Sequence, residues 1–324
     1  MQSIKQLQNL INKAIAESNY PESPAELYQP ISYLMDLGGK RLRPACLLMA
    51  CNLFNPDISK AIKPALGIEV FHNFTLMHDD IMDNAPLRRG QPTVHQKWNQ
   101  SVAILSGDVM LVESYKLMMQ VDPEIIVQIL EIFNATAVGV CEGQQIDMNF
   151  ESLPEVSIEQ YINMIRLKTA VLLGGALKIG ALIGGSSLAD ANLLYQFGEN
   201  LGIAFQLHDD ILDVYGDPEK FGKQVGGDII SNKKTFMLIS AQSLAEGDLS
   251  CKLENLLNSS ENDSAGKVIA VTAIYDQLGV RKLAEDEISN FAAKAVQALE
   301  QVSADNSKKE ILKKFAEQLL VREH

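Results

Sequence analysis

Two short acidic motifs that nearly repeat each other are the residues best suited to chemistry in this chain. Residues 74–83 read Phe-Thr-Leu-Met-His-Asp-Asp-Ile-Met-Asp, and residues 205–213 read Phe-Gln-Leu-His-Asp-Asp-Ile-Leu-Asp. Because residues four apart share one face of a helix, the outer carboxylates of each motif can point into one volume. The two sets of carboxylates are Asp79, Asp80 and Asp83, and Asp209, Asp210 and Asp213.

Carboxylates gathered in an apolar setting need cations. The residues around both motifs are apolar, so we expect the carboxylates to enter a cavity, where clustered anions require multivalent ions. Hard oxygen ligands without cysteine favour Mg²⁺, which shares its coordination positions with substrate phosphates. A charged helix end explains a single motif equally well, but two copies in matching contexts predict a site with several Mg²⁺ ions.

A di-iron carboxylate bundle is a competing interpretation of the metal site. Glu69-Val-Phe-His72 matches the Glu-x-x-His pattern of that class on a helix. The class needs two such motifs, and the sequence contains one.

Basic residues in glycine-bounded or proline-bounded segments could hold a second anionic substrate. Residues 38–44 read Gly-Gly-Lys-Arg-Leu-Arg-Pro, and residues 86–93 read Pro-Leu-Arg-Arg-Gly-Gln-Pro-Thr. Arginine suits bidentate contacts to phosphate, and lysine supplies a point charge. A third segment, residues 221–235, combines glycines with Lys223 and Lys233 and could form a flap over a leaving group or an ordinary loop.

Apolar residues recur at helical spacing almost throughout, which predicts an all-α fold. All eleven prolines lie at or before Pro218, so we expect the C-terminal third to be purely helical. Turn-forming residues predict breaks near residues 20–30, 54–60, 84–93, 151–157, 216–232 and 258–266. No segment resembles a long linker, so residues 1–324 are expected to form one domain. The glycines at 174, 175, 180, 184 and 185 indicate close helix packing or a kink.

Composition excludes several classes of function. The net charge of −13 disfavours binding to nucleic acid or to an anionic membrane surface. The four cysteines form no Cys-x-x-Cys pair, and neither a signal peptide nor a long apolar run is evident. We therefore expect a soluble cytoplasmic protein without a membrane span.

Together the motifs resemble the trans-isoprenyl diphosphate synthases, the family of farnesyl, geranylgeranyl and longer polyprenyl diphosphate synthases. The similarity covers roughly residues 30–240, and the paired acidic motifs with Gly-Lys-Arg-Leu-Arg-Pro form a specific signature. The resemblance implies antiparallel helices around a deep central cavity, a homodimer, and metal ligation by the six aspartates. It also implies an isopentenyl diphosphate site at Lys40, Arg43, His72 and Arg89. The allylic diphosphate would be bound by Arg88, Lys168, Thr169, Gln206, Lys223 and Lys233, with Gln144 and Asp147 as supporting polar groups.

The implied reaction is a Mg²⁺-dependent condensation of isopentenyl diphosphate with an allylic diphosphate. Metal ions and cations stabilise the departing diphosphate, the allylic cation forms, and the double bond of isopentenyl diphosphate attacks it. Phe71 and Phe74 precede Asp79 on the same helix and could close the cavity floor, although core packing explains them equally well. By resemblance, Phe74 and the unexpanded first motif favour a geranylgeranyl (C20) product, with farnesyl (C15) next.

Several alternatives remain open at the level of sequence. A terpene cyclase or a head-to-head synthase shares the acidic motif, but neither explains the basic segment at residues 39–43. A longer-chain synthase differs only in the depth of the cavity. A non-catalytic regulatory partner of a prenyltransferase, or a simple bundle that binds divalent ions, would not need all of these groups.

Overall fold

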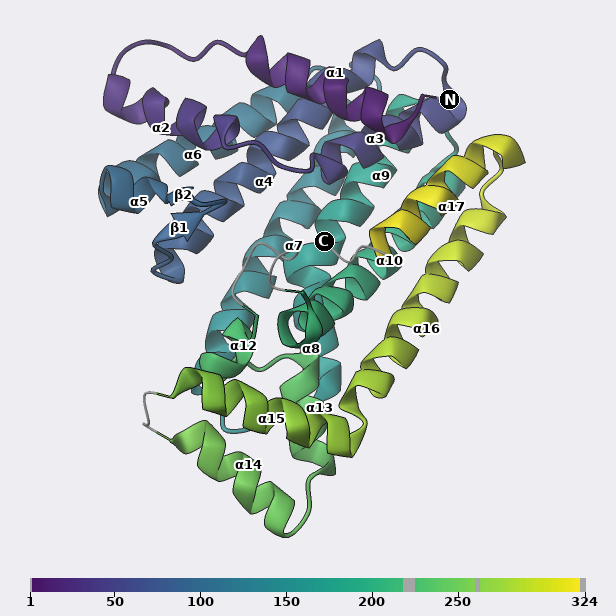
Figure 1. Cartoon of the computed structure of the whole chain (residues 1–324). Helices are drawn as coiled ribbons and strands as arrows, with labels where there is room; N and C mark the ends of the chain where they lie inside the picture. The colour runs from purple at the N-terminus through teal and green to yellow at the C-terminus, as the bar shows by residue number, and fades with distance from the viewer. Residues whose placement is uncertain (1, 218–224, 260–262, 321–324) are drawn as a thin grey trace. The chain divides into compact units, whose positions relative to one another are not determined.

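Helices build almost the whole of the chain in the computed structural model, which describes residues 2–217, 225–259 and 263–320 (Figure 1). Within these ranges the only strands are two segments of two residues each. The all-α class predicted from the sequence is confirmed. The chain forms two compact units, the first from residues 1–135, 175–194 and 303–311, and the second from residues 136–174, 195–302 and 312–324.

The first unit contains most of the N-terminal helices. Its elements are α1 (Ile4–Ala16), α2 (Ala25–Asp36), α3 (Leu42–Phe54), the 3₁₀ turn η1 (Ser59–Ala61), α4 (Ile62–Met82), β1 (Leu87–Arg88), β2 (Gln91–Pro92), α5 (Val94–Lys97) and α6 (Gln100–Met118). A capping box starts α1, since the Ser3 hydroxyl accepts from the backbone N–H of Gln6 while the Gln6 side chain binds the Ser3 N–H.

The second unit is built around a different set of helices. They are α8 (Ile158–Ile165), the π-helical turn η2 (Arg166–Ala170), α12 (Gly227–Ile230), α13 (Phe236–Leu244), α14 (Asp248–Asn258), α15 (Ser264–Leu278) and α16 (Val280–Gln301). Four further helices contribute residues to both units: α7 (Ile126–Ser152), α9 (Val171–Ile183), α10 (Leu188–Tyr215) and α17 (Asn306–Leu320).

The predicted breaks fall where helices end. For example, α3 ends at Phe54, α4 at Met82, α7 at Ser152, α10 at Tyr215 and α14 at Asn258. The proline-free C-terminal region is helical through α17 with short connections, in the part that the structure describes. The expectation of a single domain stays a prediction.

A short hairpin, which the sequence did not predict as strands, follows α4. Leu87 pairs with Pro92 and Arg88 with Gln91, and the hairpin lies beside the end of α4 (Figure 1). The two turn residues, Arg89 and Gly90, have φ values of 53° and 74°. Positive φ at both positions is typical of a type I′ turn, which matches the twist of paired strands.

The glycines of α9 serve close packing rather than a kink. A Cβ at Gly180 would lie 2.0 Å from the carbonyl oxygen of Leu47, and one at Gly184 would lie 2.6 Å from that of Cys51. Helix α9 can therefore approach the backbone of α3 only because these positions carry no side chain.

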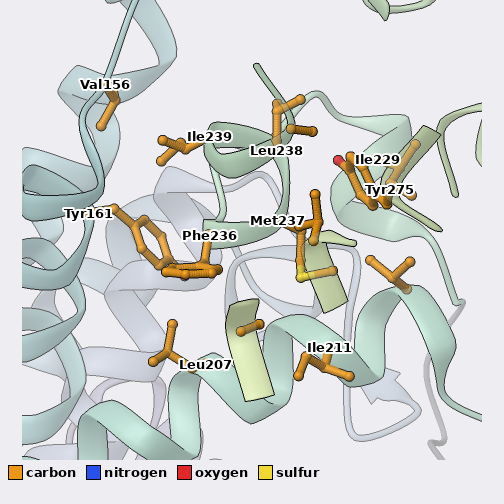
Figure 2. Packing of buried hydrophobic residues seen from close by; sticks show 14 of the residues in the cluster. Val156, Tyr161, Leu207, Ile211, Ile229, Phe236, Met237, Leu238, Ile239 and Tyr275 are labelled. Atoms are coloured by element: carbon orange, nitrogen blue, oxygen red, sulfur yellow. The ribbon is translucent and has the colours of Figure 1, made fainter. Parts of the chain in front are cut away.

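A cluster of buried apolar side chains holds the second unit together (Figure 2). Leu207 and Ile211 come from α10, Phe236 and Met237 from α13, and Tyr161 from α8. These helices carry much of the candidate site, so the core that stabilises the unit also fixes its functional side chains.

Helix α7 is the one described helix that is long and apolar enough to cross a membrane by length and composition alone. One such helix is weak evidence for a span, because core helices of soluble proteins meet the same criteria. It also carries Glu131, Glu142 and Asp147, charges that are expensive inside a bilayer.

Candidate active site

The first acidic motif ends α4, with Asp79 and Asp80 in the last turn of the helix and Asp83 as its C-cap residue. The helix ends in a Schellman motif, with Asn84 in the left-handed region at φ 49°. The N–H of Ala85 donates to the carbonyl of Asp80 at 2.9 Å, and that of Asn84 to the carbonyl of Ile81 at 3.2 Å. Asp79 and Asp83 are thereby held one turn apart at the end of the helix.

Asp80 is buried and binds an arginine of the hairpin. Its carboxylate accepts from Arg88 Nε at 2.8 and 2.9 Å, and Arg88 Nη2 lies 2.7 Å away. Burial raises the pKa of Asp80, and the bond from Arg88 opposes that rise. Asp80 therefore places Arg88 beside the first motif. Asp79 and Asp83 are more exposed than Asp80, so their carboxylates are accessible to a ligand.

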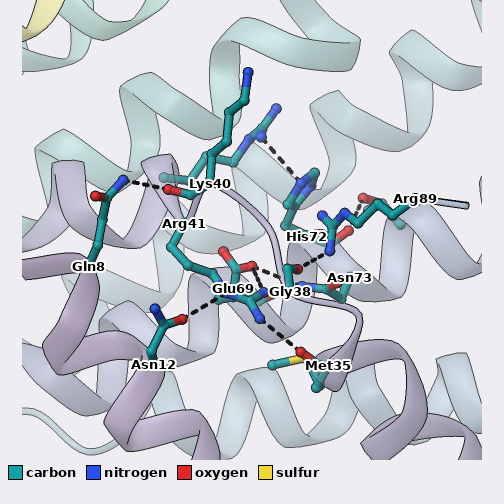
Figure 3. A network of polar contacts seen from close by, with 12 residues as sticks. Gln8, Asn12, Met35, Gly38, Lys40, Arg41, Glu69, His72, Asn73 and Arg89 are labelled. Atoms are coloured by element: carbon teal, nitrogen blue, oxygen red, sulfur yellow. Dashed lines mark hydrogen bonds and ion pairs between the residues drawn. The ribbon is translucent and has the colours of Figure 1, made fainter. Parts of the chain in front are cut away.

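The basic segment at residues 38–43 lies against α4 (Figure 3). Lys40 is exposed, and Arg43 Nη1 lies 3.3 Å from His72 Nε2. Since a guanidinium only donates, His72 accepts through Nε2 and is neutral. Burial and the nearby charge of Arg43 hold the pKa of His72 well below 6.5.

Arg89 connects the hairpin to the basic segment. Its Nη1 donates to the carbonyl of Gly38. The φ of Gly39 is 138°, a backbone conformation that favours glycine, and a Cβ there would lie 2.8 Å from Arg89 Nη2, so a side chain would also displace the guanidinium. The predicted residues for isopentenyl diphosphate, Lys40, Arg43, His72 and Arg89, thus gather in the first unit.

The second acidic motif lies in the last two turns of α10. Asp210 is buried and accepts from Tyr161 Oη at 2.5 Å and from the Phe236 N–H at 3.3 Å. Burial raises its pKa to about 7, against the opposing effect of the bond from Tyr161. Asp210 therefore joins α10 to α8 and α13 in the core, and sequence reasoning missed Tyr161.

Asp213 is fixed by the start of α12, through its N-cap residue Gly226 and through Asp228 in its first turn. Its carboxylate Oδ2 accepts from the N–H of Asp228 at 3.0 Å, and its carbonyl accepts from the N–H of Gly226 at 2.6 Å. Asp228 is a further carboxylate near the second motif that the sequence analysis did not single out. The Gly-Gly-Asp run at residues 226–228 was the available signal.

Asp147 on α7 holds two of the predicted lysines. Its Oδ2 lies 2.6 Å from Lys168 Nζ and 3.8 Å from Lys233 Nζ. Thr169 Oγ1 donates to Gln206 Oε1 at 3.4 Å, and Gln206 Nε2 lies 3.5 Å from Asp210. Lys168, Thr169, Lys233, Gln206, Gln144 and Asp147 all belong to the second unit, whereas Lys223 lies outside the described residues.

A π-helical turn presents Lys168 and Thr169. Residues 166–170 form η2, and such turns are frequent at functional sites. Two glycines make room for it: a Cβ at Gly143 would lie 2.2 Å from the backbone nitrogen of Lys168, and one at Gly202 would lie 2.7 Å from the Cα of Ala170.

The donor set of each acidic group suits a hard divalent ion. Both groups sit at C-terminal ends of helices, where the helix dipole adds negative charge. Their outer carboxylates, Asp79 and Asp83, and Asp209 and Asp213, offer oxygen ligands and are not fully buried. Among the described residues, no three His, Cys, Asp or Glu side chains gather closely enough to form a metal site by themselves.

The aromatic residues before the first motif belong to a row of rings in tilted or edge-to-face contact. Phe71 lies 5.6 Å from Phe74 and 5.2 Å from Phe133, and Tyr115 lies 4.9 Å from Phe133, all between ring centroids. Phe71 is completely buried and Phe74 is 8% exposed. Phe133 and Tyr115 extend the predicted pair and were not anticipated, because they come from other helices.

The Glu-x-x-His motif has a different use from metal binding. Glu69 binds Arg41 at 2.5 Å, and His72 binds Arg43. His78 fits over Gly107 on α6, and its Nε2 lies 3.1 Å from the carbonyl oxygen of Ile104.

Comparisons with known proteins identify the family. The model of the polyprenyl synthetase family matches residues 24–275. A geranylgeranyl diphosphate synthase from Methanosarcina mazei is 40% identical over 240 residues, which cover 74% of each chain. A crystal structure of a geranylgeranyl pyrophosphate synthase superposes with a TM-score of 0.95 and 42% identity over 99% of both chains.

A polyprenyl synthase from Caulobacter crescentus, solved with calcium and an isoprenyl diphosphate, superposes with a TM-score of 0.85. It is 28% identical, over 99% of this chain and 98% of that one. Since the family model, sequence relatives and solved structures agree, the chain belongs to the polyprenyl synthetase family, the trans-isoprenyl diphosphate synthases, and is a prenyltransferase.

Proposed function

We propose that the chain condenses isopentenyl diphosphate head-to-tail with an allylic diphosphate and releases a short all-trans prenyl diphosphate. One observation carries the proposal: each compact unit combines an Asp-Asp-x-x-Asp motif with its own set of cations. Lys40, Arg43 and Arg89 accompany the first motif, and Lys168 and Lys233 accompany the second. Two sets of cations suit two diphosphate substrates.

In the proposed reaction, the cations of the second unit hold the leaving diphosphate. Asp147 keeps Lys168 and Lys233 close together, so that both can donate to phosphate oxygens as negative charge develops there. Arg88, oriented by Asp80, adds a third cation in this proposal, and Lys223 a fourth. The side-chain dipoles of Thr169 and Gln206 steady the allylic cation.

The residues of the first unit orient the second substrate. Lys40, Arg43, Arg89 and neutral His72 bind isopentenyl diphosphate and bring its double bond towards the cation. The released diphosphate accepts the proton that the product loses, so no protein base is needed.

We propose Mg²⁺ as the metal, held by Asp79, Asp83, Asp209 and Asp213. When bound, the ions neutralise the diphosphate and make it a better leaving group. The buried positions of Asp80 and Asp210 favour supporting roles for these two carboxylates. Calcium in the Caulobacter crescentus relative supports a divalent ion in this family.

The proposed product is geranylgeranyl diphosphate, with farnesyl diphosphate as the next candidate. The buried ring row of Phe74, Phe71 and Phe133 supports an early stop to chain growth. The resemblance to a geranylgeranyl diphosphate synthase at 40% identity supports the same product class.

We also propose a cytoplasmic homodimer. Leu105 and Val112 on α6 and Met119, the C-cap residue of that helix, are spaced by seven residues and are 58%, 59% and 51% exposed. An apolar stripe of this period pairs well with a second copy of itself. The four free thiols suit a reducing compartment.

A product assay tests the proposed function. Purified protein with Mg²⁺ and labelled isopentenyl diphosphate is supplied with dimethylallyl, geranyl or farnesyl diphosphate, and the products are sized by chromatography. We expect mainly C20 product. Products of C30 or longer would overturn the proposed length, and no product from any primer would favour a non-catalytic partner.

A further inference from the structure

The buried ion pair of Arg41 and Glu69 is not used by the proposed reaction, although Arg41 lies between two residues assigned to isopentenyl diphosphate. Both side chains are almost inaccessible, at 3% and 2% exposure, and Arg41 Nη1 lies 2.5 Å from Glu69 Oε1. A buried ion pair contributes little to net stability, because desolvation offsets the attraction. Its position in the basic segment therefore calls for another explanation.

Arg41 occupies a backbone conformation that costs free energy. Its φ and ψ are 47° and 39°, in the left-handed region that arginine rarely adopts. It is also the N-cap residue of α3 and makes no side-chain capping bond there. Three cations at the start of a helix meet the positive end of its dipole, which further disfavours this arrangement.

The side chain of Arg41 compensates by anchoring the segment at several points (Figure 3). Arg41 Nη2 donates to the carbonyl of Met35 at 2.8 Å, and Nε lies 3.4 Å from Asn12 Oδ1. Glu69 is itself held, since Asn73 Nδ2 donates to its Oε1 at 3.1 Å. The guanidinium thus joins α1, α2 and α4 around one buried carboxylate.

The conformation of Arg41 determines where the other two cations of the segment, Lys40 and Arg43, can lie. With Arg41 turned inward in the left-handed conformation, Lys40 is left exposed and Arg43, two residues later, reaches His72 on α4. Glu69 and His72 are three residues apart on one face of α4, so that a single helix receives both arginines of the segment. The spacing of the two phosphate-binding cations is then set by the buried pair.

We infer that Arg41 and Glu69 are positioning residues, which fix Lys40 and Arg43 in the arrangement that binds the diphosphate of isopentenyl diphosphate. This inference rests on the proposed function. It assigns the Glu-x-x-His motif on α4 to orientation of the basic segment: Glu69 holds the central arginine, and His72 contacts the outer one.

The first test is Glu69→Gln, which removes the counter-charge and keeps an oxygen near Arg41. We expect the KM for isopentenyl diphosphate to rise on the order of tenfold, while the KM for the allylic diphosphate and kcat stay within about twofold. A matched control is Lys60→Met, which breaks an exposed ion pair with Asp122 in the same unit and should change neither KM.

A double variant separates positioning from stability. Arg41→Met with Glu69→Leu replaces the buried pair by apolar side chains, a change that is often neutral or stabilising. If the pair positions the loop, this double variant melts near the wild-type temperature but keeps the raised KM for isopentenyl diphosphate. A wild-type KM for isopentenyl diphosphate in the folded double variant would overturn the inference. The double variant gives this answer even if Glu69→Gln does not fold.

The wild-type assay keeps the two proposals apart. If the wild-type protein makes no prenyl product, the proposed function itself fails. If the wild-type protein is active and both variants bind isopentenyl diphosphate normally, only the positioning role is lost.

Discussion

Individual carboxylates of the two Asp-Asp-x-x-Asp motifs differ in their surroundings. Asp79 and Asp83 lie on one side of the last turn of α4, whereas Asp80 is buried against Arg88. The same division places Asp210 in the core with Tyr161. Helical geometry could have predicted this split, because the middle residue of each motif is turned about 100° from the first aspartate and about 60° from the last, whereas those two are only about 40° apart. The identities of the partners could not be predicted, since they come from distant segments.

His72 gives a residue-level prediction about stability and pH. Burial and the charges of Arg43, Arg89, Arg88 and Arg41 lower the pKa of His72 well below 6.5. Below pH 6.5 the unfolded state therefore binds a proton at this histidine more readily than the native state does. The contribution of neutral His72 to the free energy of unfolding is fully present above pH 6.5 and is lost as the pH falls towards the pKa of His72 in the native state.

We therefore expect the stability difference between wild type and His72→Gln to shrink by about 1 kcal/mol between about pH 7.5 and about pH 5.5. Urea denaturation of both proteins at the two pH values measures this difference. A difference in free energy of unfolding that stays the same at the two pH values, or that is larger at the lower pH, would contradict the assignment of a neutral His72.

Phe74 gives a residue-level prediction about product length. Phe74→Ala removes a ring that is 8% exposed and leaves the completely buried Phe71 and Phe133, so the growing chain should extend further. We expect products longer than those of the wild type, resolved by chromatography. Phe291→Ala on α16, which alters a ring packed against the core of the second unit, is the control and should leave the distribution unchanged. The same distribution in Phe74→Ala would remove Phe74 from this role.

At the scale of elements, glycines on α7 and α10 make room for the π-helical turn η2. The π-helical turn η2 carries Lys168 and Thr169, and Gly143 and Gly202 let the neighbouring backbones approach it. Glycine weakens a helix by its low helix propensity. The close packing of the neighbouring backbones therefore explains why glycine occupies these two positions. The sequence indicated which segments were helical, but not that one of them contains a π turn.

Gly143→Ala should displace this turn, because the new Cβ would meet backbone atoms of Lys168 rather than a flexible side chain. We expect kcat to fall at least about tenfold, since a small misplacement of a charged group costs much in rate. Gly139→Ala lies one turn earlier on α7, where a Cβ makes ordinary contacts from 3.4 Å, and should retain activity. Equal activity in the two variants would show that η2 does not depend on this contact.

The basic segment also shows where sequence reasoning reaches its limit. In residues 38–44 the sequence showed three cations after a glycine turn, and the resemblance assigned Lys40 and Arg43 to isopentenyl diphosphate but gave Arg41 no role. Arg41 is instead a buried anchor, while Lys40 is exposed and Arg43 reaches His72. The anchoring role of Arg41 could not be predicted from the sequence, because the carboxylate that accepts its hydrogen bond lies 28 residues away on α4. The all-α class and several helix ends, among them those of α3, α4 and α7, by contrast, follow from local periodicity and turn residues.

At the scale of the whole molecule, the prediction concerns assembly. Val112→Glu places a charge in the exposed apolar stripe of α6, and burying that charge against a second copy would be costly. We expect light scattering to give a dimer mass for the wild type and a monomer mass for the variant at micromolar concentration. Ile269→Glu alters an apolar residue that is 71% exposed on α15 and should remain dimeric. A wild-type monomer, or a dimeric Val112→Glu protein, would contradict this interface.

The central claim is that both acidic motifs act on diphosphate through bound divalent ions. The most direct measurement is the rate of prenyl transfer by Asp79→Asn and Asp209→Asn over a range of Mg²⁺ concentrations, with circular dichroism to confirm folding. We expect each variant to lose at least about 100-fold in kcat, and EDTA to abolish wild-type activity. Near-wild-type rates in either folded variant, or transfer that persists in EDTA, would contradict the account.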